Sequence, residues 1–207
     1  MADTAMALVI EALTVMRDQT TLRYEQTIQQ GDIVTLQGRS GVGKTTLLLT
    51  LAGFAQAQSG HVRWGDQALL DKPAESRPIS ILFQENNLFE HISAFDNACL
   101  GMGDTSLIET RDKVRAASSL LQIDQQLHKK PSELSGGQRQ RVALLRTLLR
   151  PEPIILLDEP FAELDPATRK LALNWTKDVA KANHKTVLMV THQDEDVSAI
   201  ADRNWVL

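Results

Sequence analysis

Short apolar runs, separated by glycine, proline and charged residues, dominate the first eighty-five residues of the chain. They predict strands at 7–13, 22–28, 33–37, 61–64 and 79–83. A helix is expected over 44–55, and since it is apolar on nearly all sides it should be buried. This part of the chain therefore indicates an α/β structure.

The pattern changes to a helical one between about residues 85 and 150. Ser135 is a good N-cap, and Pro151 stops the helix that follows it. The apolar face of this helix consists of Val142, Leu145, Leu148 and Leu149. We interpret 85–150 as a helical insertion into an α/β core formed by 1–84 and 151–207.

The last part of the chain returns to alternating strands and helices. The run 154–158 is continuously apolar, as in a parallel strand that is buried on both faces. A helix over 166–182, a strand at 186–191 and a last strand from Trp205 complete the predicted core.

A glycine-rich segment follows the strand 33–37 and opens the helix 44–55. It matches G-x-x-x-x-G-K-[ST] at every fixed position, in the strand–turn–helix context that this motif requires. Lys44 should reach the β- and γ-phosphates of a nucleotide, and Thr45 should hold Mg²⁺. The alternative is a chance glycine turn. The expected phosphate-binding residues are Gly38, Ser40, Gly41, Val42, Gly43, Lys44, Thr45 and Thr46.

Two carboxylates, Asp158 and Glu159, stand at the end of the apolar strand 154–158. The carboxyl edge of a parallel sheet is where ligands bind, so both should lie beside the phosphate loop. Asp158 suits a Mg²⁺ ligand acting through water, and Glu159 suits a general base for the attacking water. An ordinary acidic pair at a strand end is the alternative.

A second glycine motif, consisting of Ser135, Gly136, Gly137 and Gln138, opens the long helix after Leu134. A helix N-terminus attracts anions, so this is a second candidate phosphate site. One ATP already fills the first site, and we expect the second to close on the γ-phosphate of an ATP held by another copy. The alternative is a helix cap whose glycines serve packing.

Composition narrows the choice of partners and compartment. The 207 residues carry a net charge of −4 without a long block of one sign, which gives nucleic-acid binding no support. Apolar runs are too short for a membrane span, and the N-terminus lacks a basic segment that leads into an apolar one. We expect a cytosolic protein in which the single cysteine, Cys99, is a buried small apolar residue.

With both glycine motifs and the acidic strand end in this order, the chain from Leu8 onward resembles the ATPase subunits of ABC transporters. The resemblance implies a P-loop NTPase (RecA-like) core with a mostly parallel sheet, an N-terminal antiparallel β region and the helical insertion, all in one ABC ATPase domain. It implies a homodimer that sandwiches two ATP molecules with Mg²⁺. Gln84 and His192 match the residues that sense Mg²⁺ and contact the γ-phosphate, and 162–165 matches the loop that communicates across the dimer.

The implied catalytic residues are therefore Glu159, His192 and Gln84, and the implied metal-binding residues are Thr45, Gln84 and Asp158. The resemblance also implies a peripheral protein on the cytoplasmic face of the inner membrane. Its partners would be integral-membrane permease subunits and, indirectly, a periplasmic solute-binding protein. Single-domain length without a fused membrane segment favours an importer.

The segment 77–89 is most similar to that of the ATPases of bacterial thiamine importers, whereas 31–36 is similar to another importer ATPase. The expected cargo is thiamine, with another small solute as the alternative. A soluble ABC ATPase that acts on nucleic acid or ribosomes is a further alternative. In the loop after Gln84, we expect Leu88 and Phe89 to line a groove for a permease helix, unless they pack inside the helical insertion.

The chain departs from the family pattern at three places. Arg39 replaces a frequent proline and Ala162 a usual serine. The stretch 15–18 lacks the aromatic residue that usually stacks on adenine, so Met16 or Arg17 becomes the candidate platform. Tyr24 is the nearest aromatic residue, and its position predicts a residue of the strand core.

Overall fold

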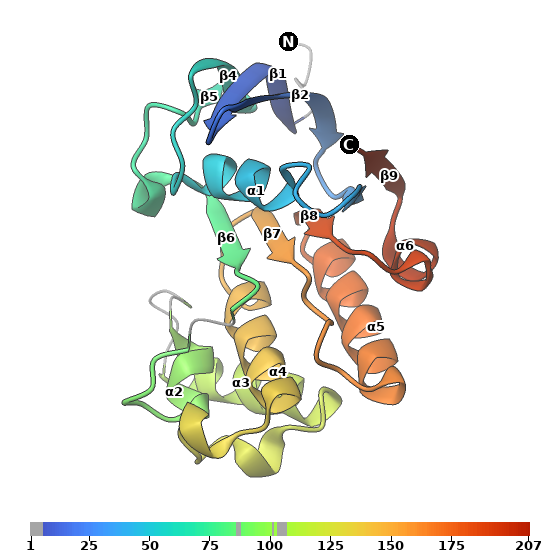
Figure 1. Cartoon of the computed structure of the whole chain (residues 1–207). Coiled ribbons are helices and arrows are strands. Elements are labelled where there is room, and N and C mark those ends of the chain that lie inside the picture. Colours follow the sequence, from blue (N-terminus) through green and yellow to red (C-terminus); the bar gives the residue numbers. More distant parts are fainter. Residues whose placement is uncertain (1–5, 86–87, 101, 103–106) are drawn as a thin grey trace.

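We describe the fold from a computed structural model of the chain, which covers residues 6–85, 88–100, 102 and 107–207. Figure 1 shows an antiparallel sheet at one end, a parallel sheet in the middle, and a group of helices at the other end.

The antiparallel sheet has the strand order β2-β1-β4-β5. Its strands are β1 (Ala7–Arg17), β2 (Thr20–Gln29), β4 (Ser59–Trp64) and β5 (Gln67–Ala68). β1 is longer than predicted because a register shift between Ile10 and Leu13 lets pairing with β2 continue past the irregularity.

The second sheet has the order β6-β7-β8-β3-β9, and all its neighbouring strands run parallel. Its strands are β3 (Ile33–Gln37), β6 (Ile79–Leu82), β7 (Ile154–Asp158), β8 (Thr186–Val190) and β9 (Arg203–Val206). The predicted α/β class, with a parallel sheet and an N-terminal antiparallel region, is confirmed.

Helix α1 (Lys44–Ala52) lies between the two sheets (Figure 1). Its residues Leu47, Leu48 and Leu51 share one buried cluster with residues of β1, β3, β7 and β8. The expected burial of this helix is confirmed, but its predicted end at residue 55 is wrong. Gly53 adopts φ 92° and its N–H bonds back to the last turn, which ends the helix there.

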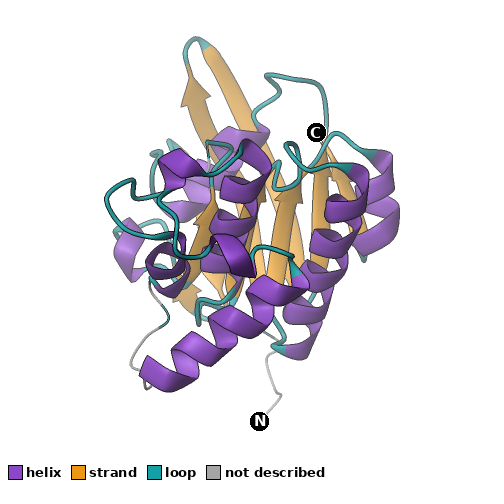
Figure 2. Ribbon diagram, turned by 90° about the horizontal axis from the view of Figure 1, so that it is seen from below, coloured by secondary structure: helices purple, strands orange, loops and turns teal. Residues whose placement is uncertain are grey.

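The other face of the parallel sheet is covered by helices (Figure 2). In β7, Ile154 and Leu156 face α1, whereas Ile155 and Leu157 belong to a second cluster that includes α4 (Gly136–Leu148) and α5 (Pro166–Ala182). The continuous apolar run of β7 is thus explained by burial on both faces. The short helix α6 (Asp194–Ile200), which the sequence pattern did not predict, follows β8.

The described residues between 85 and 150 form helices and no strands. They comprise α2 (Ala94–Cys99), α3 (Leu107–Leu120), α4 and the single turns η2 (Asp124–Gln126) and η3 (Pro131–Glu133), and another such turn, η1 (Ala74–Ser76), precedes β6. Cys99 corrects a prediction: it is only partly buried against the core cluster, at the C-terminal end of α2. Burial and the charge of Asp96 raise the pKa of its thiol.

Candidate active site

The glycine-rich segment forms the loop between β3 and α1. Gly43 is the N-cap of α1 with φ 107°, a conformation that favours glycine. Lys44 is buried, and its Nζ donates hydrogen bonds to the carbonyl oxygens of Gly38 at 2.9 Å and Arg39 at 3.1 Å. The lysine is thus held inside the curve of the loop.

Strand β2 supports this loop directly. The Tyr24 hydroxyl donates a hydrogen bond to the Gly43 carbonyl oxygen at 2.8 Å. A Cβ on Gly43 would lie 2.5 Å from this hydroxyl and 2.7 Å from a methyl of Leu22. Tyr24 is buried in the strand core, as predicted, but its contact with the loop was not. Burial raises its pKa to about 12, although Arg17 acts in the opposite direction.

Asp158 and Glu159 lie at the carboxyl end of β7, next to the phosphate loop. Asp158 is 3% exposed, and its Oδ1 has no hydrogen-bond partner among the described residues. Burial raises the pKa of this carboxyl, whereas the Thr45 hydroxyl lowers it. A buried, unsatisfied carboxylate oxygen beside Thr45 is a donor set that fits a hard cation such as Mg²⁺.

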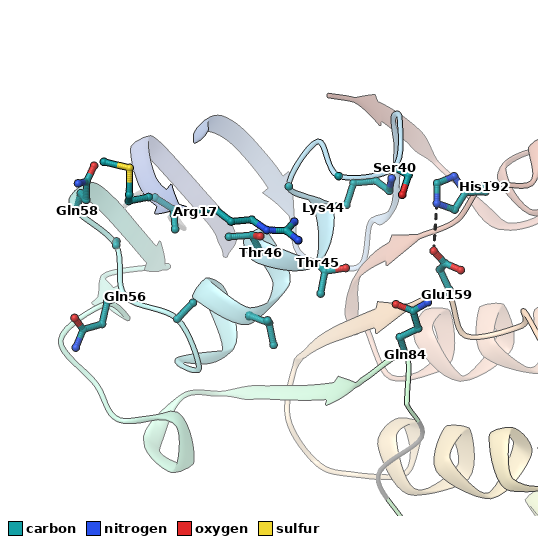
Figure 3. Close-up of a pocket in the computed structure, with 17 residues that line it drawn as sticks. Arg17, Ser40, Lys44, Thr45, Thr46, Gln56, Gln58, Gln84, Glu159 and His192 are labelled. Carbon is teal, nitrogen blue, oxygen red and sulfur yellow. Dashed lines mark ion pairs between the residues drawn. The ribbon is translucent and has the colours of Figure 1, made fainter. Parts of the chain in front are cut away.

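Glu159 turns its carboxylate toward His192, with 3.2 Å between Oε1 and the histidine Nε2 (Figure 3). Its own backbone has φ 49°, which is uncommon for a residue with a side chain. The Glu159 N–H donates to the carbonyl oxygen of Val190 at 3.1 Å, so the ends of β7 and β8 hold this turn.

The loop that carries His192 is fixed to α5. Arg169 makes two hydrogen bonds to the buried carboxylate of Asp196, at 2.8 and 2.6 Å. The Thr191 hydroxyl donates to the same carboxylate at 2.6 Å and accepts from the Gln193 N–H at 3.1 Å. His192 therefore stands between two anchored neighbours.

A cavity of about 880 Å³ brings most of the predicted site residues together. In Figure 3, Gln84, Glu159 and His192 face the loop that carries Lys44 and Thr45 across this space. The predicted residues that line it are Ser40, Gly41, Gly43, Lys44, Thr45, Thr46, Gln84, Glu159 and His192.

Met16 and Arg17 line the same cavity from the end of β1. Sequence reasoning did not find Gln56 and Gln58, whose side chains line it on the same side (Figure 3). Both lie in the loop between α1 and β4, which carries no motif.

The second glycine motif does not line this cavity. Ser135 caps α4: its hydroxyl accepts from the Gln138 N–H at 3.3 Å, and the Gln138 Oε1 accepts from the Ser135 N–H at 2.9 Å. A Cβ on Gly137 would lie 2.9 Å from the carbonyl oxygen of Glu163, and one on Gly136 would meet the Glu163 carboxylate. Within one chain the motif thus caps and packs, as its alternative interpretation expects.

A second cavity, of about 470 Å³, lies beside the parallel sheet between α1 and α4. Phe54 and Phe89 line it and are 59% and 50% exposed, and the Phe54 ring packs edge-on against Phe83. Leu88 is partly buried against the core instead. Of the predicted apolar pair, Phe89 faces this groove and Leu88 packs inward.

No helix among the described residues has both the length and the apolar character needed to cross a membrane. The same residues contain no cluster of three histidine, cysteine, aspartate or glutamate side chains that could hold a metal ion by itself. A metal at Thr45 and Asp158 would therefore take its remaining ligands from other groups, such as the Gln84 side chain, water or substrate.

These features define a P-loop nucleotide-binding protein: a phosphate loop between a parallel strand and a helix, with an acidic strand end beside it. The sequence matches the family described as ABC transporter over residues 23–162. The chain belongs to the ABC transporter family, and it is an ATPase of that type.

Relatives with similar sequences cover most of the chain. A thiamine import ATP-binding protein ThiQ from Vibrio parahaemolyticus is 42% identical over 94% of this chain and 84% of its own length. The protein of the same name from Jannaschia sp. is 41% identical over 96% of this chain and 87% of its own length. The solved dimeric post-hydrolysis state of the ATP-binding cassette MJ0796, bound to ADP and Pi, has a TM-score of 0.83 at 27% identity and covers 98% of this chain and 94% of its own.

Proposed function

We propose that this chain is the ATP-hydrolysing subunit of a bacterial importer and that it energises uptake of thiamine. The observation that carries the ATPase chemistry is the cavity into which Lys44, Glu159 and His192 project together. The relatives named as thiamine import ATP-binding proteins support the cargo.

In this proposal the phosphate loop binds the nucleotide. Lys44 leaves its two carbonyl partners and turns to the β- and γ-phosphates, which also face the N–H groups at the start of α1. Thr45, Gln84 and Asp158 would hold Mg²⁺, with the carboxylate of Asp158 acting through water. When bound, the ion neutralises phosphate charge.

Glu159 acts as the general base. Its carboxylate removes the proton of a water molecule that attacks the γ-phosphorus, while the bond from this phosphorus to the bridging oxygen breaks and ADP leaves. His192 orients this carboxylate and contacts the γ-phosphate. The 3.2 Å contact between the two side chains supports this pairing.

We further propose that the active form is a homodimer, in which Ser135, Gly136, Gly137 and Gln138 of one copy close on the ATP of the other. Support comes from the position of this motif outside the chain's own cavity and from the dimeric state of the related cassette structures. The domain division is proposed as a core of 1–84 and 151–207 with a helical subdomain of 85–150.

The groove lined by Phe54, Phe83 and Phe89 is proposed to receive a short cytoplasmic helix of the permease. Exposed aromatic rings in a hollow suit an amphipathic helix. The subunit would then lie at the cytoplasmic face of the inner membrane, and a periplasmic solute-binding protein would deliver the cargo to the permease.

Sharing of the site between copies is tested by mixing two inactive variants. Lys44→Ala removes the positive charge that should bind the β- and γ-phosphates. Gly136→Asp places a carboxylate where the partner's γ-phosphate should bind. Each alone should lack activity, but a mixed dimer contains one intact composite site, so mixing should restore turnover. Gly136→Ala is the matched control because it displaces the Glu163 side chain without adding charge. Mixed dimers that form without regaining activity would contradict sharing.

The cargo is tested by uptake of labelled thiamine in cells with and without the gene for this chain. The strain should have no second thiamine importer. Uptake should depend on the gene and on an intact Lys44. Unchanged uptake after loss of the gene would contradict the thiamine proposal and leave the ATPase proposal standing.

A further inference from the structure

Gln140 is a buried carboxamide near the start of α4 that no motif accounts for. Its side chain is 2% exposed, and both the nitrogen and the oxygen of its carboxamide make hydrogen bonds. The Nε2 donates to the carbonyl oxygen of Glu159 at 3.1 Å, and the Oε1 accepts from the N–H of Glu163 at 2.9 Å. One side chain thus fastens α4 to both ends of the turn after β7.

The first of these bonds reaches the backbone of the residue proposed as the general base. Glu159 is held in the left-handed region at φ 49°, which is a strained conformation for a residue with a side chain. A strained conformation persists only where its surroundings fix it. The Val190 carbonyl fixes the Glu159 N–H, while Gln140 and the Ala162 N–H, at 3.3 Å, fix its carbonyl.

The second bond reaches the segment 162–165. The Glu163 backbone lies directly over the first turn of α4, because a Cβ on Gly137 would come within 2.9 Å of the Glu163 carbonyl oxygen. Gln140 adds a second contact between α4 and Glu163, because its Oε1 accepts a hydrogen bond from the Glu163 N–H. The second glycine motif, this segment and Glu159 are therefore connected within one chain.

We propose that Gln140 is a positioning residue for hydrolysis, which fixes the Glu159 backbone relative to α4 so that the carboxylate faces the attacking water. The inference rests on the proposed role of Glu159 as base. It also means that a shift of the α4 N-terminus on closing over a nucleotide is transmitted to Glu159 in part through the buried side chain of Gln140.

Two substitutions at Gln140 distinguish the effects of its two hydrogen bonds. Gln140→Met has a similar volume and makes neither bond. Gln140→Glu can still accept the Glu163 N–H, but its ionised carboxylate cannot donate to the Glu159 carbonyl. Both should lower kcat by about tenfold or more, with KM for ATP within about twofold, because misplacing a catalytic group affects the chemical step rather than binding. Gln140→Met with parental kcat would overturn the proposal.

The matched control is Thr176→Val on α5. The Thr176 hydroxyl is also buried and donates to the carbonyl oxygen of Ala172 within its own helix, at 2.7 Å. Losing this bond should lower stability without slowing turnover. Equal losses of kcat in Thr176→Val and the Gln140 variants would mean that Gln140 is merely structural, and would overturn the proposal.

The most direct test combines Gln140→Met with Glu159→Gln in a double variant and measures its turnover. If Gln140 acts through the Glu159 carboxylate, Gln140→Met should change the residual turnover of Glu159→Gln by less than about twofold, because coupled residues are not additive. A full tenfold loss in the double variant would overturn the inference. Glu159→Gln with parental turnover would overturn the base assignment and this inference together. A slow Glu159→Gln beside parental Gln140 variants would overturn the inference alone.

Discussion

The hydroxyl of Tyr24 donates a hydrogen bond to the carbonyl oxygen of Gly43 at 2.8 Å, which attaches the antiparallel sheet to the phosphate loop. The same carbonyl accepts the N–H of Leu47 at 2.9 Å, so the first turn of α1 and strand β2 hold one peptide group between them. The sheet that carries Met16 and Arg17 is in this way fixed relative to the phosphate site.

Tyr24→Phe should therefore weaken both folding and nucleotide binding. Loss of one buried hydrogen bond should lower the free energy of unfolding by about 1 kcal/mol. The loosened loop should raise KM for ATP by roughly two- to fivefold. Urea unfolding and steady-state kinetics measure the two effects, and Thr176→Val should reproduce only the first. An unchanged KM in Tyr24→Phe would show that the loop does not need this bond.

Tyr24 is also the single tyrosine of the chain, so its ionisation can be followed in isolation. Burial raises its pKa to about 12, above the ordinary value of 10. A raised pKa stabilises the fold below pH 10, and this contribution is lost as the pH rises toward 12. The absorbance of tyrosinate should appear in the native protein at a pH about two units higher than in urea. Tyr24→Phe should remove the loss of stability that ionisation of Tyr24 causes at alkaline pH. Coincident titrations in the native and unfolded states would contradict this.

Base selectivity should be loose because the described part of the cavity presents Met16 and Arg17 instead of an aromatic ring. A guanidinium stacked on a base contributes on the order of 0.5–2 kcal/mol and distinguishes purines poorly. GTP should compete with ATP within about tenfold, and replacing both residues by alanine should weaken ATP binding by roughly three- to thirtyfold. Unchanged ATP affinity in the double variant would remove them from the site.

Phe89→Ala should uncouple transport from hydrolysis. Phe89 is half exposed in the groove beside α4, where its loss removes apolar surface offered to the permease. Thiamine taken up per ATP hydrolysed should fall by about fivefold or more in reconstituted transporter. Ile108→Ala is the matched control, since Ile108 is 74% exposed on α3 and does not line the groove. A parental ratio in Phe89→Ala would argue for docking elsewhere.

The motifs located the phosphate loop and the acidic strand end from sequence because both are local: a strand leads directly into each of them. The hydrogen bonds that Gln140 makes to Glu159 and Glu163, like the bond from Tyr24 to Gly43, join segments far apart in the chain. Neither periodicity nor propensity reports such pairings. Gln140 stands between Arg139 and Arg141 in the polar first half of α4, so residue type did not mark it as buried.

Some predicted ends of helices and strands were wrong for a different reason. Gly53 was available as a stop signal for α1, yet the apolar residues beyond it favoured a longer helix. Strand β1 was predicted to end at residue 13, whereas its pairing with β2 resumes at Leu13 and continues to Arg17. Cys99 was expected in the core from its residue type alone, whereas its place in the last turn of α2 leaves it partly exposed.

The central claim is that Glu159, 3.2 Å from His192 and beside the phosphate loop, is the base for ATP hydrolysis. The most direct test compares ATP binding and turnover in Glu159→Gln, which keeps the size of the side chain but removes its basicity. Glu25→Gln, on the exposed face of β2, is the matched control. The account predicts that Glu159→Gln binds ATP with parental affinity, and that its rate of hydrolysis is lower by roughly a hundredfold or more. Turnover of ATP by Glu159→Gln at the parental rate would contradict it.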